Sequence, residues 1–146
     1  MTVIAWDGKT LAADRQMTWN DMRTTVCKIQ RMPNGEVIGA TGDSAKALGM
    51  LQWYERGAKP EAWPEWQTAE DYARLIVARP GKRLVYFDWI PVEQPIFDPF
   101  MAFGSGRDYA MAAMAMGADA VKAVEITNQF CASTGLGVDS LDVGEE

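Results

Sequence analysis

Two short apolar runs separated by a turn lie at the amino terminus, and they constrain the fold more than any other feature of the sequence. Residues 2–6 read TVIAW, Asp7-Gly8 is a turn signal, and residues 10–14 read TLAAD. This pattern predicts a β-hairpin that starts almost at the first residue. Chain termini are usually loosely held, so a terminus fixed in a sheet needs either a packing reason or a chemical reason.

Strand patterns and helix patterns alternate in blocks along the rest of the chain. After a polar stretch at 15–24, the sequence predicts strands and helices in the order strand, strand, helix, helix, strand, strand, strand, helix, helix, strand. Asp43 or Ser44 is expected to cap the first helix. The predicted ranges are 25–31, 36–42, 43–57, 68–79, 83–89, 90–94, 100–104, 107–117, 118–133 and 138–143.

The order of these blocks indicates the fold class. Runs such as TVIAW and EVIGA are apolar almost throughout, which is typical of strands buried on both faces. Strands followed by helices, twice in succession, favour an α+β fold in which two sheets stack face to face and helices cover their outer faces. With 146 residues, 48% of them hydrophobic, the chain fits one domain over 1–146.

Charge and targeting signals narrow the function classes. The net charge is −6 and the basic residues are scattered, which argues against nucleic-acid binding. The sequence shows neither a secretory signal pattern nor an apolar run long enough to span a bilayer, so we expect a cytoplasmic protein. Cys27 and Cys131 leave a long-range disulfide formally open, although buried thiols are the commoner case in a reducing compartment.

The sequence contains no histidine. This absence excludes histidine-dependent catalytic triads, histidine-ligated metal sites and the commonest general base near neutral pH. Two cysteines without CxxC spacing are too few for a cysteine-rich zinc site. Any catalytic centre must therefore use other groups.

Several segments together resemble proteasome β-type subunits of the amino-terminal-nucleophile hydrolase superfamily, and above all the bacterial HslV peptidases. The matching features are a threonine directly after Met1, a hairpin that ends at Asp14, a lysine in TVCKI, and the segments GATGDSA, FGSGRDYAMAA and ITNQFCAST. The resemblance implies a four-layer αββα sandwich, assembly into homo-oligomeric rings, and threonine-dependent hydrolysis of polypeptides. It also implies a partner unfoldase ring driven by ATP.

The resemblance assigns roles to residues at the amino terminus. Removal of Met1 would give Thr2 both a hydroxyl nucleophile and a free α-amine, which can act as the base that a histidine would otherwise supply. Asp14 would orient Lys28, and the Lys28 ammonium would lower the proton affinity of the Thr2 amine and hydroxyl. Backbone amides around Gly42 would form the oxyanion hole, and Ser105 would support the proton network.

Each of these residues also has a structural interpretation. Lys28 lies in an otherwise apolar segment, where an unpaired ammonium would be costly, but a lysine on an exposed edge strand is the commoner case by about two to one. Asp14 can simply end a strand at a turn. Ser105 can cap a tight strand-to-helix turn, and a dinucleotide-binding loop is disfavoured because Tyr109 occupies the third glycine position.

The last helix departs from the proteasome pattern. Phe130 stands where proteasome subunits carry an acidic residue, and ITNQFCAST aligns better with the HslV segment that helps bind a cation. The resemblance therefore implies a monovalent cation, such as Na⁺, near Asn128, Cys131 and Thr134, held mainly by backbone carbonyls.

Two functions remain open at this point, a ring-forming threonine peptidase and a ring-forming scaffold relative without catalysis. Retention of Met1 would favour the scaffold. The tryptophans Trp53, Trp63 and Trp66 are compatible with a subunit interface or with local packing of a loop.

Overall fold

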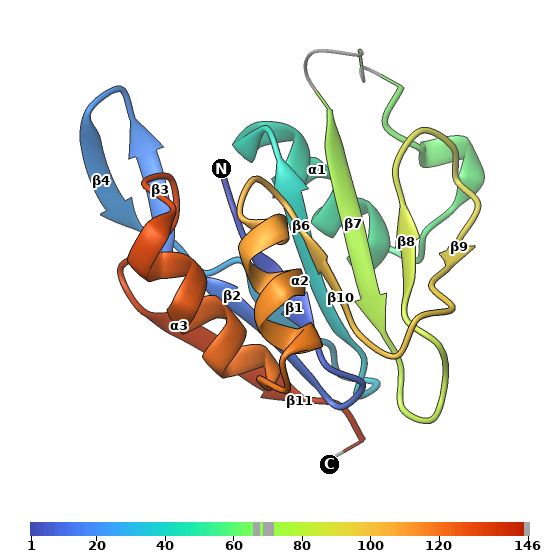
Figure 1. Ribbon diagram of the computed structural model, residues 1–146. Coiled ribbons are helices and arrows are strands. Elements are labelled where there is room, and N and C mark those ends of the chain that lie inside the picture. Colours follow the sequence, from blue (N-terminus) through green and yellow to red (C-terminus); the bar gives the residue numbers. More distant parts are fainter. Residues whose placement is uncertain (66–67, 69–71, 145–146) are drawn as a thin grey trace.

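Three antiparallel strand groups and three α-helices make up the computed structural model, which describes residues 1–146 except 66–67, 69–71 and 145–146 (Figure 1). One sheet has the strand order β10-β1-β2-β11, and a second has the order β5-β6-β7-β8-β9. The bounds in the first sheet are β1 Ile4–Trp6, β2 Thr10–Asp14, β10 Met101–Phe103 and β11 Val138–Asp142. Those in the second are β5 Ile29–Arg31, β6 Val37–Gly42, β7 Ala73–Ala78, β8 Val85–Phe87 and β9 Gln94–Pro95.

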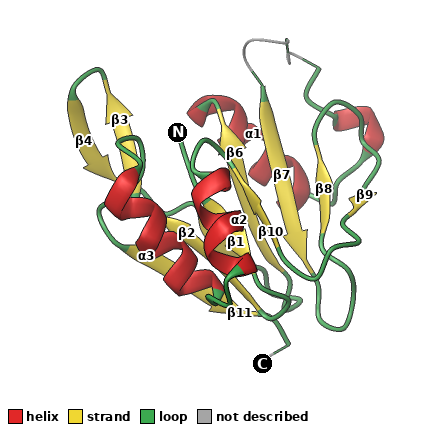
Figure 2. Cartoon of the chain, in the orientation of Figure 1, coloured by secondary structure: helices red, strands yellow, loops and turns green. Residues whose placement is uncertain are grey.

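The helices pack on different sheets. α1 (Ser44–Glu55) packs on β6 and β7, whereas α2 (Arg107–Ala115) and α3 (Ala120–Phe130) pack on the sheet that contains β1 and β2 (Figure 2). A short 3₁₀ turn over Pro60–Ala62 follows α1. In the described part of the chain, no helix is both long and apolar enough to cross a bilayer.

Three apolar clusters hold these elements together. The first joins the two large sheets and includes Ile4 and Leu11 from one sheet and Val37 and Ile76 from the other. The second lies between α2, α3 and the sheet that contains β1, and the third lies between α1 and β6–β8. Strands β1, β2, β6 and β7 bury residues on both of their faces and are apolar almost throughout, which confirms the expectation for β1 and β6.

The amino-terminal hairpin is confirmed, with Ala5 paired to Ala12 across β1 and β2. The mixed helix and strand composition and the cap of the first helix are also confirmed: the Asp43 side chain accepts a hydrogen bond from Lys46 N at 3.0 Å. The two helices after residue 106 and the last strand lie where they were expected.

The predicted helix over 68–79 is wrong for residues 73–78, which form β7, and residues 69–71 lie outside the described part of the chain. The segment ARLIVA is buried on nearly every residue and pairs with β6 and β8. A short apolar run buried on both faces carries no periodicity that separates strand from helix, so an acidic segment before it was misread as a helix start.

The polar stretch at 15–24 contains a further hairpin that was not predicted. β3 (Gln16–Trp19) and β4 (Met22–Thr25) pair around Asn20, which has a φ of 53°. Asparagine tolerates this left-handed conformation, so Asn20-Asp21 was the missed turn signal.

The strand predicted over 25–31 is also corrected, because β5 begins only at Ile29. Lys28 therefore precedes the strand. The strand predicted over 90–94 is shifted and shortened to β9, Gln94–Pro95.

Candidate active site

The Asp14 carboxylate is the centre of the polar network at the amino terminus. Asp14 ends β2, its side chain is fully buried, and it accepts four hydrogen bonds. Oδ1 accepts from Val3 N at 3.1 Å and from Lys28 Nζ at 2.8 Å. Oδ2 accepts from Gln16 N and Gly135 N, both at 3.2 Å. A buried carboxylate that accepts this many hydrogen bonds holds its neighbours in place, so Asp14 does more than end a strand at a turn.

Lys28 is the cationic partner of Asp14. Its side chain is 8% exposed, and Nζ donates to Asp14 and, at 2.9 Å, to the carbonyl oxygen of Met1. Burial lowers the pKa of Lys28, and the charge and hydrogen bond of Asp14 oppose that shift. The interpretation of Lys28 as an exposed edge-strand lysine is therefore wrong, because its ammonium lies inside an ion pair next to the terminus.

Thr2 is held in place by the turn that joins β10 to α2. Thr2 is only 5% exposed. Its backbone N–H donates a hydrogen bond to Ser105 Oγ at 3.2 Å, and its carbonyl oxygen accepts one from Gly106 N at 3.1 Å. Gly104 has a φ of +94°, and a Cβ at this position would overlap the carbonyl oxygen of Thr2. The turn therefore touches Thr2 through backbone that only glycine can provide.

Ser105 does not cap α2, since the N-cap residue is Gly106 and no side chain caps this helix. Instead, the Ser105 hydroxyl lies 3.2 Å from the Ser133 hydroxyl, which in turn lies 3.2 Å from Cys131 Sγ. Burial alone would raise the pKa of the Cys131 thiol, but its hydrogen bonding with Ser133 lowers it. Ser133 was not predicted as a site residue, and nothing in the letters FCAST singles it out.

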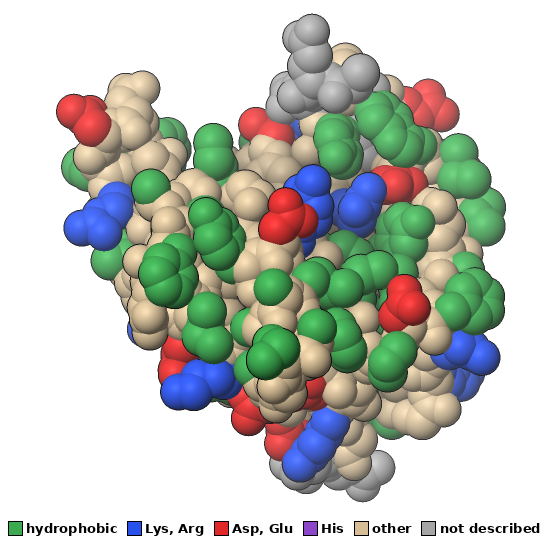
Figure 3. All heavy atoms as spheres, in the orientation of Figure 1, with side chains coloured by type: hydrophobic (Ala, Val, Ile, Leu, Met, Phe, Trp, Pro, Cys, Tyr) green, Lys and Arg blue, Asp and Glu red, His purple; other side chains and the backbone are tan. Residues whose placement is uncertain are grey.

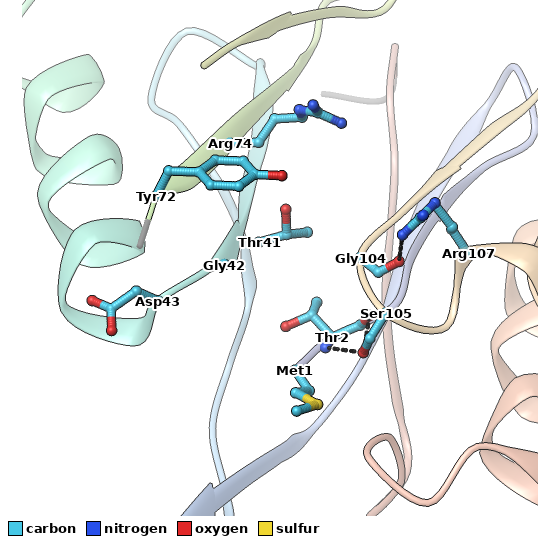
Figure 4. A pocket seen from close by; sticks show the side chains of 10 residues that line it. All are labelled: Met1, Thr2, Thr41, Gly42, Asp43, Tyr72, Arg74, Gly104, Ser105 and Arg107. Carbon is cyan, nitrogen blue, oxygen red and sulfur yellow. Dashed lines mark hydrogen bonds between the residues drawn. The ribbon is translucent and has the colours of Figure 1, made fainter. Parts of the chain in front are cut away.

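Gly42 stands at the exposed end of β6 and has a φ of +107°. A side chain here would overlap the carbonyl oxygen of Tyr72. Two pockets meet at Gly42, Thr2 and Met1. The larger, of about 710 Å³, also includes residues from β7 and from the β10–α2 turn (Figure 4). The smaller, of about 200 Å³, is lined mainly by apolar side chains, including Val26, Ala40, Leu48 and Leu51.

The residues predicted to lie near a cation are on α3 and the loop that follows it. Asn128 donates through Nδ2 to Gly137 O at 3.2 Å, whereas Asn128 Oδ1 and Thr134 Oγ1 are buried without hydrogen-bond partners among the described residues. Two buried oxygens without donors fit a hard cation chemically. No group of three His, Cys, Asp or Glu side chains that could hold a metal converges in the described part of the chain.

The remaining sequence candidates have structural positions. Trp53 and Trp63 pack edge to face at 4.7 Å between ring centroids, within the cluster under α1, and Trp66 lies outside the described residues. Cys27 and Cys131 are both free thiols, and Cys27 is exposed rather than buried.

Comparison with solved structures identifies the architecture. HslV from Trypanosoma brucei superposes with a TM-score of 0.69 at 24% sequence identity, over 97% of both chains. This chain has the fold of HslV. BPH from Thiobacillus denitrificans superposes with a TM-score of 0.72 at 20% identity over the full length of both chains. A second BPH structure, in complex with epoxomicin, gives 0.67 at 21% identity over 98% of both chains. Neither a family model nor a curated protein sequence matches the chain.

Proposed function

We propose that this chain is a threonine-type endopeptidase whose nucleophile is Thr2 after removal of Met1. The buried Asp14–Lys28 ion pair beside Thr2 is the observation that carries the proposal. A buried ion pair contributes little net stability to a fold, because apolar residues of similar size in its place often leave the protein equally stable. An ammonium next to an amino-terminal hydroxyl residue can, in contrast, help to activate that residue as a nucleophile.

In the proposed first step, Thr2 Oγ1 attacks the carbonyl carbon of the scissile peptide bond and transfers its proton to the Thr2 α-amine. The negative charge on the carbonyl oxygen would be stabilised by backbone amides around Gly42. When the C–N bond breaks, the α-ammonium returns the proton to the leaving amine, and an ester to Thr2 remains. Water, deprotonated by the same amine, then hydrolyses the ester and restores Thr2.

Lys28, Asp14 and Ser105 support this chemistry without bonding to the substrate. The carbonyl that Lys28 contacts belongs to the peptide bond between Met1 and Thr2, so the ammonium lies next to the atoms of a freed Thr2 amine. Burial and Lys28 lower the pKa of the Met1 amine, and the same causes would keep a Thr2 amine neutral enough to act as a base. Ser105 is the hydrogen-bond partner of Thr2 N.

The similarity to BPH supports the assignment, because that protein has been observed with epoxomicin bound. We further propose that the packing of helices on two stacked sheets is the four-layer αββα sandwich, that residues 1–146 form one domain, and that the protein is cytoplasmic. Copies would form a closed ring that receives unfolded polypeptide from an ATP-dependent unfoldase ring. Exposed hydrophobic side chains on the face that includes α2 and α3 support contacts between copies (Figure 3).

A monovalent cation such as Na⁺ is proposed at the loop after α3, where it would stabilise the loop electrostatically. Asn128 Oδ1 and Thr134 Oγ1 would face the ion, together with backbone carbonyls near Cys131. No step of the reaction passes through this site.

The alternative is a ring-forming scaffold without catalysis. In that protein Met1 would be retained, and Thr2 N would remain a peptide nitrogen that cannot act as a base. The intact mass of the purified protein separates the two, because loss of Met1 is required for the peptidase.

The proposed function is tested by comparing wild type with Thr2→Ala on small peptide amides. We expect wild type to lack Met1 and to hydrolyse the amides, and the variant to be inactive with an unchanged thermal melt. Equal hydrolysis by the two proteins would remove Thr2 from the mechanism.

A further inference from the structure

The larger pocket beside Thr2 has a basic wall that the proposed mechanism does not use. Arg74 projects from β7 and Arg107 from the first turn of α2, and their guanidinium groups point toward the space between them (Figure 4). Thr41 and Tyr72 also line this space with hydroxyl groups. The chain as a whole is acidic, with a net charge of −6, so a pocket lined by two arginines is a local concentration of positive charge.

Arg74 is incompletely satisfied by the protein. Arg74 is the register partner of Thr41 across strands β6 and β7. In its side chain, Nη2 lies 3.4 Å from Asp88 Oδ2, and the guanidinium lies over the Tyr86 ring, 5.1 Å from the ring centroid. Its Nε is buried, and no described residue accepts a hydrogen bond from it. A buried donor without an acceptor carries a desolvation penalty, which a bound anion would remove.

Arg107 occupies a position that helix stability does not favour. It is the first residue of α2, where the helix dipole is positive and a cation is unfavourable. Its Nη1 donates to Gly104 O at 3.1 Å, which fixes the guanidinium beside the residue that contacts Thr2. The neighbouring Asp108 lies 4.0 Å from Nε and is almost fully exposed, so solvent screens most of its effect.

The acidic residue that lines this pocket does not cancel the basic wall. The Asp43 side chain caps α1 through Lys46 N, and it points away from both arginines (Figure 4). Asp88 offsets part of the Arg74 charge, and the exposed Asp108 offsets little of the Arg107 charge because solvent screens it. The pocket therefore presents two guanidinium groups to a ligand at the point where the nucleophile would act.

We propose, given the peptidase function above, that this pocket binds a carboxylate of the substrate next to the scissile bond. Two arginines from opposite sides suit a carboxylate, because guanidinium groups bind it through paired hydrogen bonds. The carboxylate belongs either to a glutamate or aspartate side chain or to the carboxyl terminus of a short peptide. The pocket on the other side of Thr2 is lined mainly by apolar side chains, and the cationic side chain that lines it, Lys28, is already paired with Asp14.

The test uses internally quenched peptides that differ by one Glu-to-Gln exchange at each position flanking the cleaved bond. A parallel pair differs only in a free or amidated carboxyl terminus. We expect kcat/KM to be on the order of tenfold higher for the carboxylate member of one pair, the scale of a charge-assisted hydrogen bond. A preference in the Glu/Gln pair identifies a side chain, and a preference in the second pair identifies the terminus.

Arg107→Gln is the decisive variant, because this exposed side chain is not needed for packing. It should abolish the preference, and Arg74→Gln should do the same if its thermal melt is unchanged. Arg83→Gln is the matched control, since Arg83 also lies over an aromatic ring, that of Phe97, but does not line the pocket. Absence of preference in wild type, or its survival in Arg107→Gln, would overturn the carboxylate site.

Binding separates this inference from the peptidase proposal. Thr2→Ala should bind the carboxylate peptide on the order of tenfold more tightly than its neutral partner, and Arg107→Gln in that background should remove the difference. This binding difference, if the wild type shows no turnover, would support the pocket while contradicting the peptidase. Turnover in wild type with equal binding of both peptides would support the peptidase and reject the pocket.

Discussion

Lys28 shows how a residue with an ordinary interpretation in the sequence becomes a candidate functional group in the fold. Lys28 lies 14 residues after Asp14 in the sequence, and the fold buries both side chains in direct contact. The sequence could suggest this pair only through its resemblance to a family, because an apolar context around a lysine does not reveal whether its ammonium is buried. Ser133, Arg74 and Arg107 could not be predicted, since their roles depend on contacts between distant elements.

Replacement of Lys28 tests the electrostatic role at the residue scale. Lys28→Met removes the charge, and Lys28→Arg places a larger planar group where a compact ammonium lies between Asp14 Oδ1 and Met1 O. We expect both variants to lose activity by about a hundredfold or more, the usual scale for one preorganised charge. Normal turnover in a Lys28→Met protein with a wild-type melt and native mass would refute the role.

The pH profile of Lys28→Met adds a second readout to the same prediction. The active form has a neutral amine, so kcat/KM rises as pH rises through the pKa of that amine. Burial and the Lys28 charge lower the pKa of the Met1 amine, and we expect the same causes to act on the Thr2 amine of the processed chain. Without Lys28 that pKa rises, and the ascending limb of the residual activity should move to higher pH. An unmoved limb would mean that Lys28 does not act on the amine.

Asp14→Asn belongs to the same prediction, because Asp14 and Lys28 form one network. The change leaves Lys28 buried without a counter-charge, which typically costs about 3–5 kcal/mol of unfolding free energy. Activity should fall as well, and the double variant should lose less activity than the two single losses combined. Additive losses in folded proteins would show that the two residues act independently.

At the scale of elements, the turn between β10 and α2 is the feature that fixes the amino terminus. Strand β10 pairs with β1, and the turn then contacts Thr2 through Gly104, Ser105 and Gly106. The sequence predicted both the strand and the helix. It did not predict β7, where burial on both faces removes the periodicity, or the β3–β4 hairpin, whose residues are mostly exposed.

Gly104→Ala tests this turn. The added Cβ would combine a strained positive φ with an overlap onto the Thr2 carbonyl, so we expect a loss on the order of 2 kcal/mol or more in unfolding free energy, together with most of the activity. Gly117→Ala is the matched control: its φ is +104°, and no atom outside its immediate chain neighbours lies within 4 Å of the added Cβ in the described structure. Chemical denaturation and turnover would be measured for both. Similar effects of the two changes would contradict the proposed contact.

At the scale of the whole molecule, two sheets share one apolar cluster and each carries helices on its other face. Large hydrophobic side chains are exposed at the carboxyl ends of α2 and α3, including Met116, which follows α2, and Phe130, the last residue of α3. Tyr109 and Phe130 stack with ring centroids 6.4 Å apart, which forms an apolar ridge between α2 and α3. Such surfaces are typical of protein contacts.

We expect this protein to form a closed ring of identical subunits, because cyclic symmetry buries the same surfaces on every copy. Native mass spectrometry at micromolar concentration should give one multiple of the subunit mass. A monomer under these conditions would contradict the ring and leave a free hydrolase or a binding module.

Covalent labelling followed by peptide mapping shows directly whether Thr2 is the amino-terminal nucleophile. The protein would be incubated with epoxomicin, the compound bound to BPH in the structure described above, then digested and analysed by mass spectrometry. We predict an amino-terminal peptide that starts at Thr2 and carries one added epoxomicin mass, and we predict that this adduct is absent in Thr2→Ala. An unmodified peptide that still begins with Met1 would contradict it.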